Sequence, residues 1–113
     1  MRMKDKVVLV TGGATGIGKA TALRFAEEGA RVAICDVNIA LGQEAVKLLG
    51  EAAMFHPVNV ANREEVQHWV GQVVARYGRI DVLINNAGVL RDSQRVKFKG
   101  VQVSGQMSEI EFN

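Results

Sequence analysis

The sequence predicts an α/β protein built on a doubly wound parallel sheet with helices on both faces. Short apolar, β-branched runs alternate along the chain with segments of helical periodicity. Strands separated by helices imply right-handed crossovers, which make the strands parallel. A glycine-rich run over residues 11–18 lies between the first strand and the first helix. We therefore expect a three-layer α/β/α arrangement of Rossmann type, present as a βαβαβαβ unit.

The first strand is predicted over residues 7–10, which are continuously apolar, as in a strand buried on both faces. A helix is predicted from residue 17 to about 28, because Gly29 provides a C-terminal stop. Residues 31–35 form the second predicted strand.

A second helix is predicted over about residues 39–49, with Gly50 as its stop. Its apolar side chains are expected to share one stripe, formed by Leu41, Ala45, Leu48 and Leu49. A short third strand is expected over residues 53–57.

The third helix has the clearest signals. Asn62 and Glu65 form an N-cap and N3 pair of capping-box type, and Gly78 ends the helix. Apolar residues recur at helical spacing, namely Val66, Trp69, Val70, Val73, Val74 and Tyr77. This spacing favours core packing for the two aromatic residues. Residues 81–85 then form the fourth predicted strand.

The segment over residues 89–107 is longer than the usual connection between such elements. Its apolar alternation is consistent with a small hairpin, through Val96, Phe98, Val101 and Val103. Its basic residues favour a solvated loop face over an anion or carrier-protein contact, and are Arg91, Arg95, Lys97 and Lys99. Ser108 and Glu111 form a second capping-box pair two residues before the sequence ends. We therefore expect this sequence to be part of a longer protein.

The bulk composition limits the function classes. A chain of 113 residues, 48% of them hydrophobic and 23% charged, is expected to form one soluble domain over residues 1–113. A net charge of +2 is too small to favour nucleic acid or an anionic membrane. Only four strongly apolar residues follow the charged N-terminus, so we expect neither a signal peptide nor a membrane span. The single cysteine, Cys35, fits a reduced, cytoplasmic setting.

The glycine-rich run is the strongest functional signal, because a turn between a strand and a helix directs backbone N–H groups and the helix dipole at one point. Gly12 permits the tight turn, Gly16 lets the backbone approach a pyrophosphate, and Gly18 lets the helix pack closely on the strand. An acid, Asp36, follows Gly18 by 18 residues. This context predicts dinucleotide binding rather than a merely structural turn.

Asp36 at the end of the second strand favours NAD over NADP. Its carboxylate can accept hydrogen bonds from both hydroxyls of the adenosine ribose and would repel a 2′-phosphate. An NADP site would carry an arginine or lysine near the 2′-phosphate. The two positions expected to provide it are Thr15 and Val37, whose side chains are neutral. The alternative is that Asp36 is only a helix N-cap. His56 and His68 have no partners at metal-ligand spacing, so no metal is assigned.

These motifs together make the chain resemble the short-chain dehydrogenase/reductase family. The resemblance rests on T-G-x-x-x-G-x-G over residues 11–18, on Asp36, and on the run Asn85-Asn86-Ala87-Gly88. The first 88 residues look most like the 3-oxoacyl-carrier-protein reductase branch and its NAD-using relatives.

The resemblance implies roles for further residues. Thr15 and Ile17 would flank the phosphates and the nicotinamide-side ribose. The Asn59 side chain and the Val60 amide would lie against the adenine ring, although many members of the family carry Asp at the position of Asn59. The residues at the end of the fourth strand would close the cofactor cleft, and these are Asn86, Ala87 and Gly88. Asn86 and Gly88 would contact the adenosine ribose, and Asn85 would brace the sheet.

The family's catalytic residues are a tyrosine, a lysine four residues later, a serine and an asparagine. Here the one tyrosine, Tyr77, is followed four residues later by Asp81 and falls in the wrong helix, and Asn113 is not the family asparagine. No catalytic residue is assigned, and the 113-residue chain alone is expected to be inactive.

The leading hypothesis is the N-terminal, cofactor-binding part of an NAD-dependent oxidoreductase that interconverts alcohol and carbonyl groups, with a 3-oxoacyl thioester as one candidate substrate. The alternatives are a truncated nucleotide-binding module without catalysis and, less favoured, an interaction protein that uses the basic segment. A homo-oligomer is expected. The apolar strand over residues 82–84 would lie at a sheet edge open to another chain, unless residues 96–103 fold over it.

Overall fold

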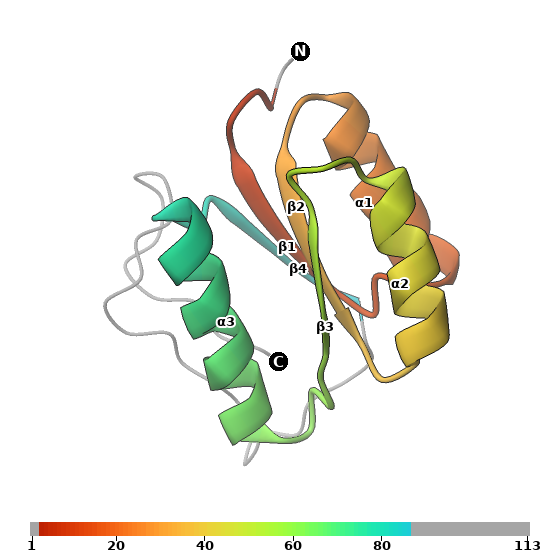
Figure 1. The fold of residues 1–113 in the computed structure, drawn as a ribbon, viewed down its shortest axis with the longest axis vertical. Helices are drawn as coiled ribbons and strands as arrows, with labels where there is room; N and C mark the ends of the chain where they lie inside the picture. Colours follow the sequence, from red (N-terminus) through yellow and green to blue (C-terminus); the bar gives the residue numbers. More distant parts are fainter. Residues whose placement is uncertain (1–2, 87–113) are drawn as a thin grey trace.

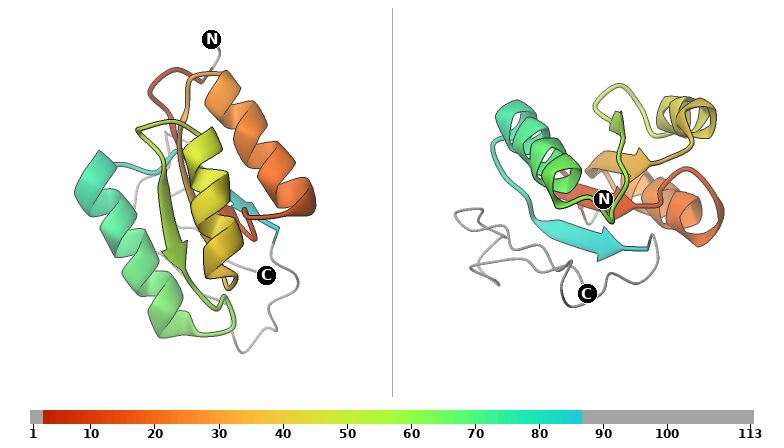
Figure 2. Two further views of the ribbon diagram at one scale, coloured as in Figure 1. Left: turned by 45° about the vertical axis from the view of Figure 1, so that its right-hand side comes forward. Right: turned by 90° about the horizontal axis from the view of Figure 1, so that it is seen from below.

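The computed structural model describes residues 3–86, which form one parallel sheet with helices on both faces (Figure 1). The strands are β1 (Val7–Thr11), β2 (Arg31–Asp36), β3 (Met54–Pro57) and β4 (Val82–Asn85), in the spatial order β3-β2-β1-β4. The helices α1 (Gly16–Glu27) and α2 (Ile39–Leu48) cover one face, and α3 (Arg63–Tyr77) covers the other (Figure 2). This arrangement confirms the predicted doubly wound fold. Each strand bound, and each predicted bound of α1 and α2, lies within one residue of the prediction.

The strand register brings the carboxyl ends of the strands to one edge of the sheet. Thr11 of β1 pairs with Cys35 of β2 and with Asn85 of β4, while Asp36 pairs with Pro57 of β3. Because all four strands are parallel, the loops that leave these ends are neighbours. This edge is where open α/β sheets bind ligands.

The strand β1 is buried on both faces, as predicted, and separates two hydrophobic cores. Val7 and Leu9 pack towards α3, whereas Val8 and Val10 pack towards α1 and α2. Trp69 of α3 is completely buried in the first core, which confirms its predicted packing role.

The ends of α3 agree with the sequence signals, with one difference. The Asn62 side chain caps the helix by accepting a hydrogen bond from the Glu65 N–H (3.2 Å), and Gly78 adopts φ = 81° at the C-terminal end. In a capping box the Glu65 side chain would return to the N-cap amide. Here its Oε1 instead accepts from the Asn59 N–H (3.0 Å), so Glu65 fixes the loop that leaves β3.

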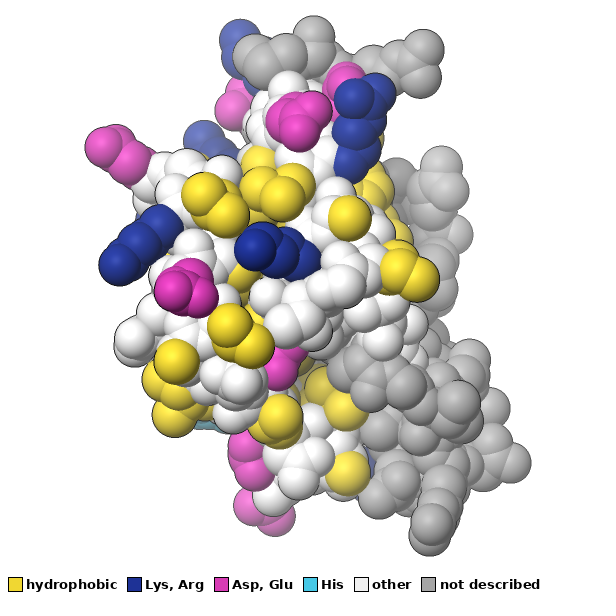
Figure 3. All heavy atoms as spheres, turned by 90° about the vertical axis from the view of Figure 1, so that its right-hand side faces the viewer, with side chains coloured by type: hydrophobic (Ala, Val, Ile, Leu, Met, Phe, Trp, Pro, Cys, Tyr) yellow, Lys and Arg dark blue, Asp and Glu magenta, His cyan; other side chains and the backbone are white. Residues whose placement is uncertain are grey.

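The predicted apolar stripe of α2 is wrong for two of its four residues. Ala45 and Leu49 are buried, but Leu41 is 37% and Leu48 60% exposed. Gly42 faces the sheet instead, where an added Cβ would lie 2.1 Å from Cε1 of Phe55. This close approach of α2 to β3 leaves both leucines on the outer surface. On the face formed by α1 and α2, hydrophobic side chains are spread among charged ones (Figure 3).

Several predictions lie outside the described residues: the hairpin over residues 96–103, the capping pair Ser108 and Glu111, and the positions of Ala87 and Gly88. None of the helices between residues 3 and 86 has the length and apolar character that a membrane crossing requires.

Candidate functional site

The turn between β1 and α1 packs onto the end of β2. Gly12 (φ = 63°) and Gly16 (φ = 57°) adopt the left-handed conformation that favours glycine. The Gly13 N–H donates to the Cys35 carbonyl (3.1 Å), and a Cβ at Gly13 would lie 2.6 Å from Cβ of Ile34. The backbone of the turn is therefore held against the sheet at a distance that only glycine allows.

Gly16 and Gly18 have opposite surroundings. A Cβ at Gly18 would lie 2.0 Å from the Gly12 carbonyl oxygen and 2.5 Å from Nδ2 of Asn86. A Cβ at Gly16 would meet no atom within 4 Å. The start of α1 thus packs closely against the turn at Gly18 and is open on the side of Gly16.

The first turn of α1 offers backbone N–H donors and contains no acidic side chain. Thr15 is the N-cap residue, and its side chain makes no capping hydrogen bond. Thr15, Gly16 and Ile17 are all exposed, Ile17 by 78%. The first N–H groups of a helix have no partner within the helix, and no acidic residue occupies this first turn. Such a helix start is suited to an anion such as phosphate.

The carboxylate of Asp36 links the turn to the loop after β2. Its Oδ2 accepts from the Ala14 N–H (3.2 Å) and its Oδ1 from the Asn38 N–H (3.0 Å). Asn38, and not Asp36, is the N-cap of α2, because its Oδ1 accepts from the Leu41 N–H (3.0 Å). The alternative interpretation of Asp36 as a simple helix cap is therefore wrong. Asp36 is partly exposed, and a carboxylate with two accepted bonds keeps lone pairs for further donors.

Residues from the end of β4 brace the other side of the turn. The Thr11 hydroxyl donates to Oδ1 of Asn85 (3.0 Å) and accepts from the Asn86 N–H (2.8 Å). Nδ2 of Asn86 donates to the Gly12 carbonyl (3.3 Å). Asn85 braces the sheet as expected, and Asn86 also supports the turn. Sequence reasoning missed Thr11, although a buried polar residue directly before a glycine turn is a detectable signal.

Asn59 and Val60 lie in the loop after β3, beside the loop that leaves β2. The Val58 N–H donates to the Asp36 carbonyl (3.1 Å), which ties the two loops together. The Asn59 side chain is exposed, and its Oδ1 accepts from the Ala61 N–H (2.9 Å). Val60 packs against the core beneath α3. The structure therefore brings these two residues to the same edge as Asp36 and the turn.

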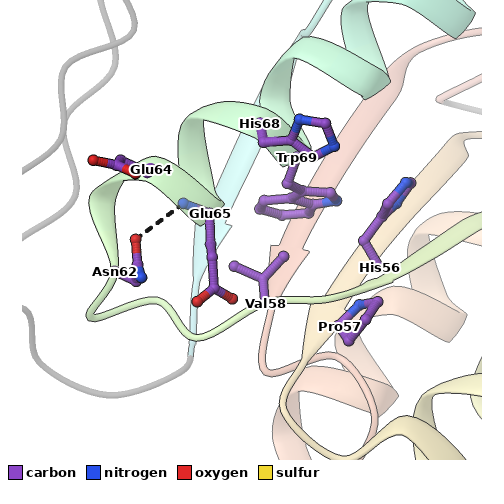
Figure 4. Close-up of a pocket in the computed structure, with 8 residues that line it drawn as sticks. All are labelled: His56, Pro57, Val58, Asn62, Glu64, Glu65, His68 and Trp69. Atoms are coloured by element: carbon purple, nitrogen blue, oxygen red, sulfur yellow. Dashed lines mark hydrogen bonds between the residues drawn. The ribbon is translucent and has the colours of Figure 1, made fainter.

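A pocket lies on the face of the sheet that α3 covers, at the first turns of that helix (Figure 4). This pocket has a volume of about 250 Å³ and is lined by His56, Pro57, Val58, Asn62, Glu64, Glu65, His68 and Trp69. Nδ1 of His56 and Nε1 of Trp69 are buried there without a hydrogen-bond partner among the described residues. Burial lowers the pKa of His56, and the neighbouring His68 lowers it further. Sequence spacing did not reveal that the two histidines share a pocket.

Glu64 and Glu65 make this pocket unlike the start of α1, because they place two carboxylates in the first turn of the helix. Negative charge there disfavours an anion. Between residues 3 and 86, no group of three or more histidine, cysteine or acidic side chains is placed to hold a metal ion. The edge formed by the glycine turn and Asp36 is thus the better candidate for a nucleotide.

The chain is similar in sequence and in fold to known proteins. The sequence model described as short chain dehydrogenase matches residues 6–113. The chain is 47% identical over 103 residues to the 3-oxoacyl-(acyl-carrier-protein) reductase FabG of Thermotoga maritima, covering 88% of this chain and 42% of that protein. The chain spans less than half the length of the curated relatives it matches.

Two solved structures share the fold. The 3-ketoacyl-(acyl-carrier-protein) reductase from Brucella melitensis, complexed with NADH, superposes with a TM-score of 0.74 at 33% identity over 77% of this chain and 36% of that one. An NAD⁺-bound xylitol dehydrogenase superposes with a TM-score of 0.74 at 41% identity over 78% and 35% of the two chains.

Proposed function

The chain belongs to the short-chain dehydrogenase family, and on that premise we propose that it is the NAD-binding part of an oxidoreductase that interconverts alcohol and carbonyl groups. One observation carries the proposal. The partly exposed Asp36 carboxylate lies beside a glycine turn whose helix start is open and free of acidic residues. A ribose and a pyrophosphate need these two features side by side.

In the proposed complex the pyrophosphate lies at the start of α1. Gly16 has open space around it, so its backbone can approach the phosphates closely. Thr15 and Ile17 flank the phosphates and the nicotinamide-side ribose with exposed groups. Gly12 and Gly18 act indirectly, by forming the turn and by letting the helix pack against it.

The adenosine half of the nucleotide would lie between the loops after β2 and β3. Asp36 accepts hydrogen bonds from the ribose hydroxyls, and Asn59 and Val60 border the adenine ring. Asn86, Ala87 and Gly88 close the cleft from the end of β4. The proximity of Asn59 and Val60 to the Asp36 loop supports this arrangement.

The choice of NAD over NADP rests on charge. A 2′-phosphate beside Asp36 would be repelled by the carboxylate, and the neighbouring Val37 is a neutral side chain with 70% exposure. Of the two solved relatives described above, one is complexed with NADH and the other is bound to NAD⁺, which supports the same choice.

The substrate and the cellular setting of the whole protein are part of the proposal. The Thermotoga relative is a 3-oxoacyl-(acyl-carrier-protein) reductase, so a 3-oxoacyl thioester is the substrate class we propose. The protein would act as a homo-oligomer in the cytoplasm. The free, buried thiol of Cys35 supports a reducing compartment.

A second candidate function is nucleotide binding without turnover. Tyr77 lies at the C-terminal end of α3, and its hydroxyl donates to the Ala52 carbonyl. Burial raises the pKa of this phenol, opposed by the charges of Arg76 and Arg31. A tyrosine in this position stabilises the turn before β3 and does not serve as an acid for a substrate. Binding of NADH without hydride transfer from it to any 3-oxoacyl thioester would select this second candidate.

Calorimetric titration with NAD and NADP tests the proposed cofactor. We expect NAD to bind at least about tenfold more tightly than NADP, and Asp36→Asn to reduce that ratio. Glu44→Gln is a matched control, because Glu44 is an exposed acid of α2 and the change removes the same charge. Equal affinity of the unmodified protein for the two nucleotides would contradict the proposal.

A further inference from the structure

We propose that Asp36 is also a positioning residue, which holds the phosphate-binding turn in its binding conformation before any nucleotide arrives. The contact that does this joins Oδ2 of Asp36 to the Ala14 N–H, 22 positions earlier in the chain. The nature of the ligand rests on the proposed function, whereas the contact itself is independent of it.

The turn needs such support because of its composition. Residues 12–18 include four glycines, and glycine loses more backbone freedom on ordering than any other residue. Two of the four, Gly12 and Gly16, are held in the left-handed region. An ordered turn of this kind requires contacts that offset the entropy lost.

Among the described residues, three hydrogen bonds hold the turn against the ends of β2 and β4. The Gly13 N–H donates to the Cys35 carbonyl, Asn86 donates to the Gly12 carbonyl, and the Ala14 N–H donates to Asp36. The first two join neutral groups. The third has an ionised acceptor, and charge-assisted hydrogen bonds are roughly twice as strong as neutral ones. Asp36 thus supplies the charged side chain among these three anchors.

The hydrogen bond to Asp36 lies at the boundary between a buried residue and the exposed residues of the turn. Ala14 is 2% exposed and its N–H points at Asp36, while Thr15 and Gly16 immediately after it are exposed. With the Ala14 amide bound to Asp36, the exposed residues Thr15 and Gly16 carry the next N–H groups at the helix start. The carboxylate therefore fixes which amides of the turn are available to a phosphate.

Through this second role, Asp36 affects both which nucleotide the site prefers and how tightly a nucleotide binds. Asp36→Ala removes the ribose acceptor and the anchor together, so it should weaken NAD binding more than Asp36→Asn does. For NADP the loss of the anchor is opposed by the loss of repulsion at the 2′-phosphate. Asp36→Asn removes the charge but retains an oxygen that can accept from the Ala14 N–H. The asparagine variant should therefore change nucleotide preference while keeping most of the order of the turn.

Amide hydrogen exchange measured by NMR, without nucleotide, tests the anchor directly. We expect exchange of the Ala14 amide to be about tenfold faster in Asp36→Ala and only a few times faster in Asp36→Asn. The Gly78 amide is an internal control, because it donates to the Val74 carbonyl at the C-terminal end of α3 and its exchange should change little. Unchanged exchange of Ala14 in both variants would overturn the proposal. So would equal acceleration of Gly78 and Ala14, since that would mean general destabilisation of the fold and not loss of an anchor of the turn.

A ligand without ribose hydroxyls separates the anchor from the ribose contact. We expect 2′,3′-dideoxyadenosine diphosphate to bind Asp36→Ala at least about fivefold more weakly than the unmodified protein, although it cannot donate to Asp36. Equal affinity for this ligand would overturn the proposal. If neither this ligand nor ADP binds the unmodified protein, the proposed nucleotide site fails, and the exchange of Ala14 still decides whether Asp36 anchors the turn.

Discussion

Cys35 lies directly beneath the glycine turn, and its thiol is shielded. Burial raises the pKa of this thiol to about 12, with the charge of Asp36 acting in the same direction and a backbone hydrogen bond from Gly12 opposing both. The thiolate is the reactive form of cysteine. At pH 8 the folded protein should therefore react with an aromatic disulfide reagent roughly a thousandfold more slowly than the urea-unfolded protein. Complete labelling of the folded protein within seconds would contradict the burial of this residue.

His56 should make stability depend on pH below neutrality. Its pKa is lowered in the folded protein, first by burial and then by His68. Below the ordinary histidine pKa near 6.5 the unfolded chain therefore binds more protons, and the free energy of unfolding falls as the pH decreases. Urea denaturation at pH 7.5 and pH 5 should show a smaller decrease for His56→Gln than for the unmodified protein. The same decrease in both proteins would show that His56 does not contribute.

At the scale of single elements, glycines in two helices should respond oppositely to alanine. Gly18→Ala in α1 places a methyl group 2.0 Å from the Gly12 carbonyl oxygen, so we expect a loss of about 1–3 kcal/mol in the free energy of unfolding. Gly71→Ala in α3 is the matched control, because a Cβ there meets no atom within 4 Å. It should stabilise the protein by up to about 1 kcal/mol. Urea denaturation measures both values, and equal effects would contradict the close packing at Gly18.

The elements themselves could be predicted from local pattern, and their tertiary contacts could not. Glycine stops and continuous β-branched runs determined the strands and helices to within one residue. The stripe of α2 failed because Gly42, not a leucine, faces Phe55. That choice depends on how closely the helix approaches the sheet, which helical periodicity does not specify.

For the candidate site, too, the location could be predicted from the sequence and the tertiary contacts could not. Strand–turn–helix order and the position of Asp36 predicted the edge at which the site lies. The anchoring of Ala14 by Asp36 joins residues far apart in the chain. The buried Asp81 is a second example, since its Oδ2 accepts from the Val7 N–H (2.8 Å) across 74 positions and its Oδ1 pairs with Arg79. Only the folded chain reveals contacts of this kind.

At the scale of the whole molecule, the sheet edge formed by β4 is expected to govern association between chains. Within residues 3–86, β4 pairs with β1 alone and lies at the end of the sheet (Figure 2). An apolar strand at a sheet edge can pair with another chain. We expect sedimentation velocity to show mass increasing with protein concentration. A single monomeric species at high concentration would contradict the open edge.

The central claim is that a dinucleotide binds at the start of α1, beside Asp36. The most direct test is to follow the backbone amide resonances while NAD is added. We predict the largest shifts at Gly16, Ile17 and Gly18, with little change at Glu64 and Glu65 in the first turn of α3. Shifts concentrated at α3, or the absence of any shift at saturating NAD, would contradict the account.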